Sequence, residues 1–249
     1  WTILTAFKPE REIVKYPLRY FPKPATFSNF VTAWKDVGLA TYFKNSLIVS
    51  LGTVALILTL SILGGYALSR FTFKGKQWFM LTLLCTQFIP GVLLLIPMFM
   101  TFKYLGLINN MLSLVIVYTT FELPFALILV RAFISNIPEE LDEAALVDGC
   151  TRLQTVFYVI LPVVKPGIVA SAAFAYIGCW NEFLFALMLI NTQKKFTIPV
   201  GLSYMLGQFT TNYGALAAGS LLALIPPVLM FAYIQKYLVQ GLTAGAVKG

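Results

Sequence analysis

Five long stretches of this 249-residue chain are almost free of charge, and their length restricts the fold more than any other feature. A helix that crosses a bilayer needs about 20 predominantly apolar residues. Intervals of that order cover residues 45–69, 77–102, 108–130, 166–191 and 215–235. We expect Pro90 and Pro97 to kink or break the second of these helices, and 191–214 to be a loop. Only 11% of the chain is charged, against roughly 25% in soluble domains. The sequence therefore predicts an all-α, polytopic membrane protein.

The first residues and the loop charges suggest an arrangement in the membrane. WTILTAF, at residues 1–7, is typical of the end of a first transmembrane helix that is largely missing. Arg70, Lys74 and Lys76 on one turn outweigh Lys103 on the next, which predicts that the Arg70 turn is cytosolic. Seven basic residues within 8–44 count against this, but longer loops cross with less regard to charge. The expected parts are 1–7, an extracytoplasmic segment 8–41, a transmembrane domain 42–237 and a cytosolic tail 238–249.

Composition also argues against several classes of protein. The chain has no histidine, and Cys85, Cys150 and Cys179 form no CxxC pair, so we predict no metal site. The net charge is +8, but the basic residues are scattered, which suits contact with membrane lipid and argues against nucleic acid. The stretch 75–77, GKQ, lacks the spacing of a phosphate-binding loop. With no nucleophile and base pairing either, we predict no catalytic residue.

A long polar passage between apolar intervals runs over 138–162 and holds five of the ten acidic residues. Pro138 suits the first position of a helix, the acids that follow suit a helix N-terminus, and Gly149 suits the position just past a helix end. These features predict a helix of about three turns. Small or apolar side chains at spacings of three and four predict one face that docks into a groove. That face consists of Leu141, Ala144, Ala145 and Asp148.

The same passage resembles a known motif. The triplet EAA at 143–145 is followed after three residues by Gly149, and after nine more by Val159, Leu161 and Pro162. This is similar to the EAA motif, EAA-x3-G-x9-I-x-LP, of permease subunits of bacterial ABC importers, with valine in place of the usual isoleucine. FELPFAL, CWNEFLFALML and QKYLVQGLTAGAVKG are similar to the carbohydrate, maltose-type branch of that family. The resemblance covers nearly the whole chain.

The resemblance implies a type I ABC importer permease fold with six transmembrane helices, in the bacterial cytoplasmic (inner) membrane. It implies four kinds of partner: a second permease subunit, two cytosolic ABC ATPases, an extracytoplasmic substrate-binding protein and membrane lipid. ATP and Mg would be bound by the ATPases, with no cofactor in this chain. The loop over 138–162 would carry the coupling helix that sits in a cleft of an ATPase. The residues expected at that contact are Leu141, Asp142, Glu143, Ala144, Ala145, Leu146, Asp148 and Gly149.

Two acids inside the apolar intervals are further candidates. A charged carboxylate within a span costs about 2.5–3.5 kcal/mol on insertion scales, so each is a functional-site hypothesis. Glu182 follows Trp180 and Asn181, and an aromatic ring beside an amide and a carboxylate suits sugar binding. Asn181 and Glu182 also suit hydrogen bonds that hold helices or subunits together. Glu122, close to Pro124, either belongs to the substrate pathway or braces a helix kink.

The apolar intervals and the resemblance to carbohydrate permeases together imply a permease subunit that translocates a sugar or oligosaccharide and is driven by partner ATPases. Two alternatives remain open: the same kind of permease with a non-sugar solute, and a secondary transporter. A secondary transporter usually shows an internal repeat and intramembrane ion-coupling groups. The sequence offers only two candidate acids and no repeat.

Overall fold

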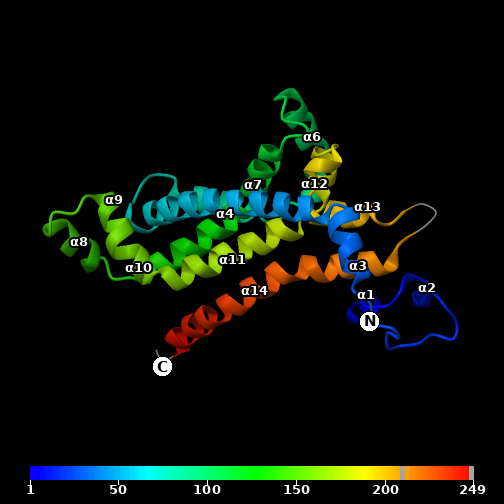
Figure 1. Cartoon of the computed structure of the whole chain (residues 1–249). Coiled ribbons are helices and arrows are strands. Elements are labelled where there is room, and N and C mark those ends of the chain that lie inside the picture. The colour runs from blue at the N-terminus through cyan, green and yellow to red at the C-terminus, as the bar shows by residue number, and fades with distance from the viewer. Residues whose placement is uncertain (208–210, 247–249) are drawn as a thin grey trace. The chain divides into compact units, whose positions relative to one another are not determined.

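The computed structural model describes residues 1–207 and 211–246 and, within them, side chains up to residue 235. Every regular element in these ranges is helical (Figure 1), which confirms the predicted all-α class. Apolar segments in a membrane form helices because each backbone N–H and C=O has to find a partner inside the protein. The tail predicted at 238–249 extends past the described residues from 247 onward.

Among the described residues, three helices are long and apolar enough to cross a membrane: α4 (Leu39–Arg70), α7 (Met111–Ser135) and α14 (Tyr213–Ala246). They correspond to the first, third and fifth predicted intervals. Two bent pairs of shorter helices also qualify if each pair forms one span, which gives up to five spans in the described residues.

One bent pair covers the second predicted interval. α5 (Lys76–Thr86) ends before Pro90, and a 3-10 turn, η2 (Gly91–Leu94), leads into α6 (Leu95–Tyr104). The predicted break at Pro90 is confirmed. The break predicted at Pro97 is wrong, because Pro97 is the third residue of α6, where a missing N–H leaves no intrahelical bond unmade.

The other bent pair includes the second half of the polar loop. Its first arm consists of α9 (Arg152–Gln154), a π-helical stretch η3 (Thr155–Ile160) and α10 (Leu161–Val163). Its second arm is α11 (Lys165–Asn181), at an angle of 85° to the first. The fourth predicted interval, 166–191, is not one helix, because α11 ends at Asn181 and a separate helix, α12 (Leu184–Leu189), follows.

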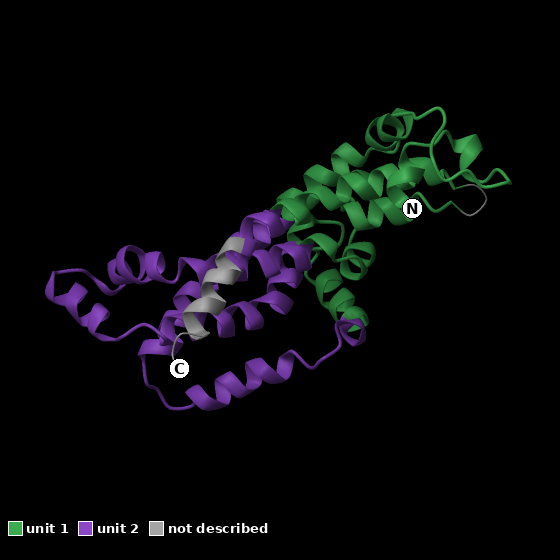
Figure 2. Cartoon of the chain, turned by 90° about the horizontal axis from the view of Figure 1, so that it is seen from below, with its two compact units in different colours: residues 1–49, 95–114, 180–229 green, residues 50–94, 115–179, 230–249 purple. Residues whose placement is uncertain are grey.

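The chain divides into two compact units (Figure 2). Unit 1 comprises residues 1–49, 95–114 and 180–229, and unit 2 comprises 50–94, 115–179 and 230–249. The polar loop belongs to unit 2, whereas the Trp180–Glu182 candidates belong to unit 1.

Unit 1 contains helices where the sequence predicted loops. The stretch 191–214 holds η4 (Gln193–Lys195) and α13 (Ile198–Tyr204), so the prediction of a plain loop is wrong there. Pro199 in the first turn of α13 is the local feature that favours this helix. The segment 8–41 follows α1 (Thr2–Ala6). It contains short helices, namely α2 (Glu10–Ile13), α3 (Ser28–Val31) and η1 (Thr32–Asp36), and its side of the membrane stays a prediction.

Hydrogen bonds from α4 hold the approach to α13 in place. Asn45 Nδ2 donates to the carbonyl oxygens of Lys194 and Phe196 at 2.9 and 3.0 Å. Ser46 Oγ accepts from the backbone N–H of Ile198 at 2.8 Å. Because these groups are buried, each bond removes an otherwise unpaired backbone group from an apolar setting.

Small residues bring the helices of unit 2 close together. Ile57 of α4, Ala126 of α7 and Ala175 of α11 form one buried cluster. A β-carbon at position 65 of α4 would lie 3.1 Å from the backbone nitrogen of Arg131 on α7. Packing of this kind is what joins helices where lipid offers no hydrophobic driving force.

Candidate functional site

The polar loop begins with α8 (Glu140–Val147) at one end of unit 2 (Figure 1). Its first turn carries Glu140, Asp142 and Glu143, where the helix dipole favours negative charge. Pro138 lies two residues before this helix, so its predicted place as the first helical residue is wrong. The helix is eight residues long, about two turns and not the predicted three.

Gly149 ends α8 in the conformation that the sequence suggested. Its φ is +86°, a left-handed conformation that glycine adopts without a steric penalty. The N–H of Gly149 donates to Leu146 O at 3.1 Å, and the N–H of Cys150 donates to Ala145 O at 2.9 Å. These two bonds form a Schellman motif, which pairs the last carbonyl oxygens of the helix.

The chain turns again two residues later. Thr151 Oγ1 accepts from the Gln154 N–H at 3.3 Å, and Gln154 Oε1 accepts from the Thr151 N–H at 2.7 Å. This capping box satisfies two backbone donors at the start of α9. In this loop α8 thus ends in a Schellman motif and α9 begins with a capping box, so hydrogen bonds define the backbone between the two helices.

A hydrophobic cluster anchors the loop. Val156, Ile160 and Val164 recur every four residues, so they share one side of the helical stretch that follows α9. They pack against Tyr66 of α4, against Val130 and Ile134 of α7, and against Ile137, which lies just after α7. Burying a side chain such as Val or Ile stabilises the fold by about 1.5–3 kcal/mol.

A buried ion pair ties α8 to α4. Arg70, the last residue of α4, donates from Nε to Asp142 Oδ2 at 2.9 Å, and its Nη2 lies 2.9 Å from the same oxygen. The two side chains are 6% and 5% exposed. Removing one partner of such a pair leaves an uncompensated buried charge. Asp142 therefore pairs within the chain through Oδ2, and its contact with a partner stays a prediction.

A second link joins the loop to the end of α4. The guanidinium of Arg152 lies 5.7 Å from the centroid of the Phe71 ring, within the range of a cation–π contact. Phe71 in turn packs edge-on against Tyr66, with ring centroids 6.2 Å apart. The start of α9 and the start of α8 are thus both attached to the same helix end.

The surface that α8 leaves open includes three of the four residues of the predicted docking face, namely Leu141, Ala144 and Asp148. Ala145 is buried, so it is not available to a partner. Leu141 is 40% exposed and Leu146 is half-buried, while Glu143 and Ala144 are exposed. The prediction that α8 contacts an ATPase stays a prediction, now for the exposed residues.

Val147 is the residue that the sequence reasoning missed. It is 88% exposed, the most exposed apolar side chain of the helix. One face of α8 carries positions i, i+3, i+4 and i+7, which are Glu140, Glu143, Ala144 and Val147. Asp148, also exposed, extends that face at the helix end.

The Trp180 side chain has a structural role in unit 1. It is 2% exposed, and its indole Nε1–H donates to Ala223 O of α14 at 3.0 Å. Pro227 lies four residues after Ala223 inside the same helix and has no N–H to offer that carbonyl. The indole replaces the missing donor, so Trp180 joins its helix to α14 by a hydrogen bond.

Glu182 also bonds within its own unit. Its Oε1 accepts from the Phe185 N–H at 2.8 Å, and its Oε2 accepts from the Ala186 N–H at 3.1 Å. Both donors lie in the first turn of α12, where backbone N–H groups have no intrahelical partner. The carboxylate therefore starts α12 after the break and interacts with the positive end of its dipole.

Asn181 is exposed and lines a cavity of about 420 Å³ in unit 1. The other walls come from α13 and α14 and include Ile198, Leu202 and Ser220. A side-chain amide both donates and accepts hydrogen bonds, as sugar hydroxyls require. Of the three neighbouring candidates, Trp180 and Asn181 line this cavity and Asn181 is exposed, while contact with substrate stays a prediction.

Glu122 lies in unit 2, on α7, and packs against α11. A β-carbon at position 178 would collide with its carboxylate, so Gly178 makes room for it. α7 continues without interruption past Pro124. The contact supports a role in helix packing.

In the part of the chain that the structure describes, no three His, Cys, Asp or Glu side chains gather to hold a metal ion.

Comparison with known proteins now decides the family. Residues 57–244 match the model of the family described as "Binding-protein-dependent transport system inner membrane component". The chain belongs to this family. Membership confirms the predicted multi-pass inner-membrane permease, whose function is transport.

Individual relatives are similar in sequence to this permease over almost its whole length. It is 37% identical to the diacetylchitobiose uptake system permease protein DasC of Streptomyces coelicolor, covering 100% of this chain and 90% of that protein. It is 34% identical to the arabinooligosaccharides transport system permease protein AraQ of Halalkalibacterium halodurans, covering 99% and 89%.

A solved structure confirms the permease fold. It is the crystal structure of a bacterial ABC transporter involved in the import of the acidic polysaccharide alginate. The TM-score is 0.84 at 22% identity, over 95% of this chain and 88% of the other.

We expect Gly149→Ala to disturb the end of α8 through the backbone alone. No atom lies within 4 Å of a β-carbon at position 149, so the left-handed φ is the only obstacle, and it costs about 1–2 kcal/mol. Gly106→Ala is the control, since Gly106 also has positive φ and open space. Thermal melts of the complete importer should shift similarly for both variants, whereas uptake should fall only for Gly149→Ala. Equal uptake by the two variants would contradict a role for this helix end.

Asp142→Asn should destabilise the permease by about 3–5 kcal/mol, because it leaves the Arg70 guanidinium buried without its counter-charge. Asp148→Asn removes an exposed carboxylate from the other end of the same helix and should stay within about 0.5 kcal/mol. The double variant Arg70→Met with Asp142→Leu should recover much of the loss, since apolar side chains replace a buried pair well. Thermal unfolding in detergent measures all three. A melt of Asp142→Asn that matches wild type would rule out the buried pair.

Proposed function

We propose that this permease is one of two transmembrane subunits of an ATP-driven ABC importer for a sugar or oligosaccharide. An extracytoplasmic binding protein delivers the substrate, and two cytosolic ATPases hydrolyse ATP with Mg. The family description supports dependence on a binding protein. The names of the relatives, which refer to diacetylchitobiose and arabinooligosaccharides, support the substrate class.

The contact with the ATPase is assigned to the exposed side of α8. Glu143, Ala144, Val147 and Asp148 present an apolar centre flanked by acids, a surface that fits a groove with an apolar floor and basic edges. The observation that carries this assignment is the buried Arg70–Asp142 pair, because a helix that transmits force must be fixed to the span it moves.

Movement then passes from the ATPases to the membrane helices. ATP binding closes the two ATPases and displaces each coupling helix. Within unit 2, the Arg70–Asp142 pair carries the displacement of α8 to α4, and the cluster around Ile134 and Ile160 carries it to α7. Packed elements of this kind move as rigid bodies, because a close-packed core does not deform continuously.

Substrate contact is assigned to Asn181, whose amide lines the cavity of unit 1. Trp180 and Glu182 act as positioning residues on either side of it. Trp180 satisfies the carbonyl of Ala223, and Glu182 starts α12. This chain holds no cofactor in the proposal.

Reconstitution of the complete importer in proteoliposomes tests the function. Its two permeases, its ATPases and its binding protein are combined, and ATP hydrolysis is measured with a panel of mono-, di- and oligosaccharides. We expect one class of saccharide, together with the binding protein, to stimulate hydrolysis and to accumulate inside. A flat response across the panel, with stimulation by a non-sugar solute, would overturn the substrate class and leave the permease assignment intact.

Val147→Asp tests the coupling contact. A carboxylate introduced at the centre of a desolvated interface should weaken association of the permease with its ATPase at least about tenfold. Leu153→Asp is the matched control, because Leu153 is 61% exposed and lies outside α8. Co-purification and basal ATP hydrolysis give the readout. Equal loss in both variants, or loss in neither, would contradict the assignment to α8.

A further inference from the structure

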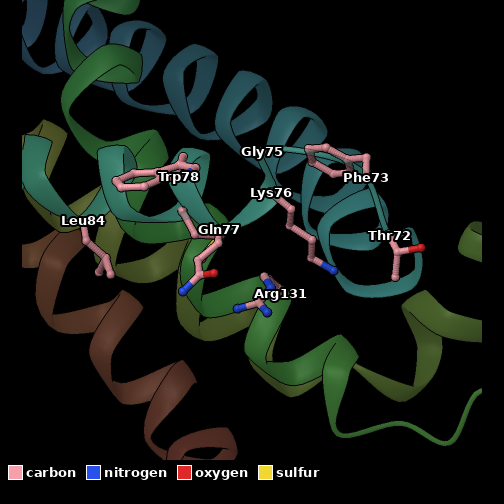
Figure 3. A pocket seen from close by; sticks show the side chains of 9 residues that line it. Thr72, Phe73, Gly75, Lys76, Gln77, Trp78, Leu84 and Arg131 are labelled. Carbon is pink, nitrogen blue, oxygen red and sulfur yellow. The ribbon is translucent and has the colours of Figure 1, made fainter.

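A pocket in unit 2 has no part in the mechanism above. It encloses about 720 Å³ between the turn that follows α4, the start of α5 and the end of α7 (Figure 3). Its lining includes Phe73, Lys76, Gln77, Trp78, Leu84 and Arg131. It lies at the end of α4 for which the loop charges predict the cytosolic membrane surface.

Two cations line this pocket without an acid to neutralise them. Lys76 Nζ donates to Phe71 O at 3.0 Å, and Arg131 Nε donates to Leu68 O at 3.3 Å. These bonds orient the side chains but leave their charge uncompensated. No Asp or Glu is among the lining residues, and in the described part of the chain the recorded salt bridge belongs to Arg70.

Polar groups from two helices converge on the same space. Figure 3 shows the amide of Gln77 on α5 and the guanidinium of Arg131 on α7 turned toward each other. α5 is eleven residues long, and no side chain caps its N-terminus at Gly75. The positive end of its dipole adds to the two cations. The pocket is therefore built to accept an anion with several oxygen atoms.

The remaining walls are apolar and open. Trp78 is 74% exposed and Leu84 is 45% exposed. None of the residues of α5 is buried, and most of them are exposed, so much of its apolar surface is uncovered. Tryptophan at such a position is typical of the headgroup level of a bilayer. An anionic head with an apolar tail matches both parts of this surface.

We propose that the pocket binds an anionic phospholipid such as phosphatidylglycerol. Its phosphate accepts hydrogen bonds from Lys76, Arg131 and Gln77, and its acyl chains lie along α5 against Trp78 and Leu84. The site is distinct from the cavity near Asn181, and it does not depend on the identity of the transported substrate. Basic pockets at the cytosolic ends of membrane helices are a common form of lipid headgroup recognition.

Native mass spectrometry of the complete importer tests the site. The complex in detergent is titrated with phosphatidylglycerol or with zwitterionic phosphatidylcholine. We expect tight binding of phosphatidylglycerol that Lys76→Gln weakens about fivefold, the factor for one basic side chain near an anionic membrane surface. Arg131→Gln should weaken it similarly. Lys74→Gln is the matched control, since Lys74 is exposed on the same turn but does not line the pocket.

Several results would overturn the proposal. Equal weakening by Lys74→Gln would show a diffuse charge effect. Equal retention of phosphatidylcholine would remove the role of the headgroup charge. Displacement of the lipid by inorganic phosphate alone would indicate a soluble anion as the ligand. Lys76→Gln and Arg131→Gln could both leave the binding of phosphatidylglycerol unchanged, while position 78 crosslinks to the second permease subunit. That result would show that protein covers this face.

Discussion

A backbone that lies in hydrocarbon has to pair its N–H and C=O groups within the protein, and two irregular points in unit 1 of this permease follow that rule. Pro227 leaves the carbonyl of Ala223 without its helical donor, and the indole of Trp180 supplies one. The break after α11 exposes the first N–H groups of α12, and Glu182 accepts from two of them. Polar side chains that suggest a ligand site thus serve the backbone first.

The loop over 138–162 is polar in sequence but firmly attached in structure. A Schellman motif at Gly149 and a capping box at Thr151 set its two turns. Beneath them, Ile160 lies in the hydrophobic core of unit 2, and Asp142 pairs with Arg70. The acids of this loop therefore divide into two groups. One is buried and holds the loop, whereas the other faces outward and is free to meet a partner.

Local signals explain which features the sequence predicted well. Charge-free intervals, the break at Pro90 and the helix end at Gly149 each depend on a few neighbouring residues, so they can be read without a structure. α13 was missed because, apart from Pro199 in its first turn, its support comes from Asn45 and Ser46, about 150 residues earlier. Val147 was missed because exposure depends on which side of α8 the rest of unit 2 covers.

The sequence by itself determined that the chain is an all-α membrane permease with a polar loop carrying the EAA pattern, because hydrophobic length and motif spacing are properties of the chain alone. Only the tertiary structure decided which polar side chains remain available. Asp142, Trp180 and Glu182 satisfy buried partners that the fold brings to them. Asn181 stays exposed at a cavity, and the cations of the α5 pocket stay without an acid. Burial makes an unpaired polar group costly, and burial is set by distant elements.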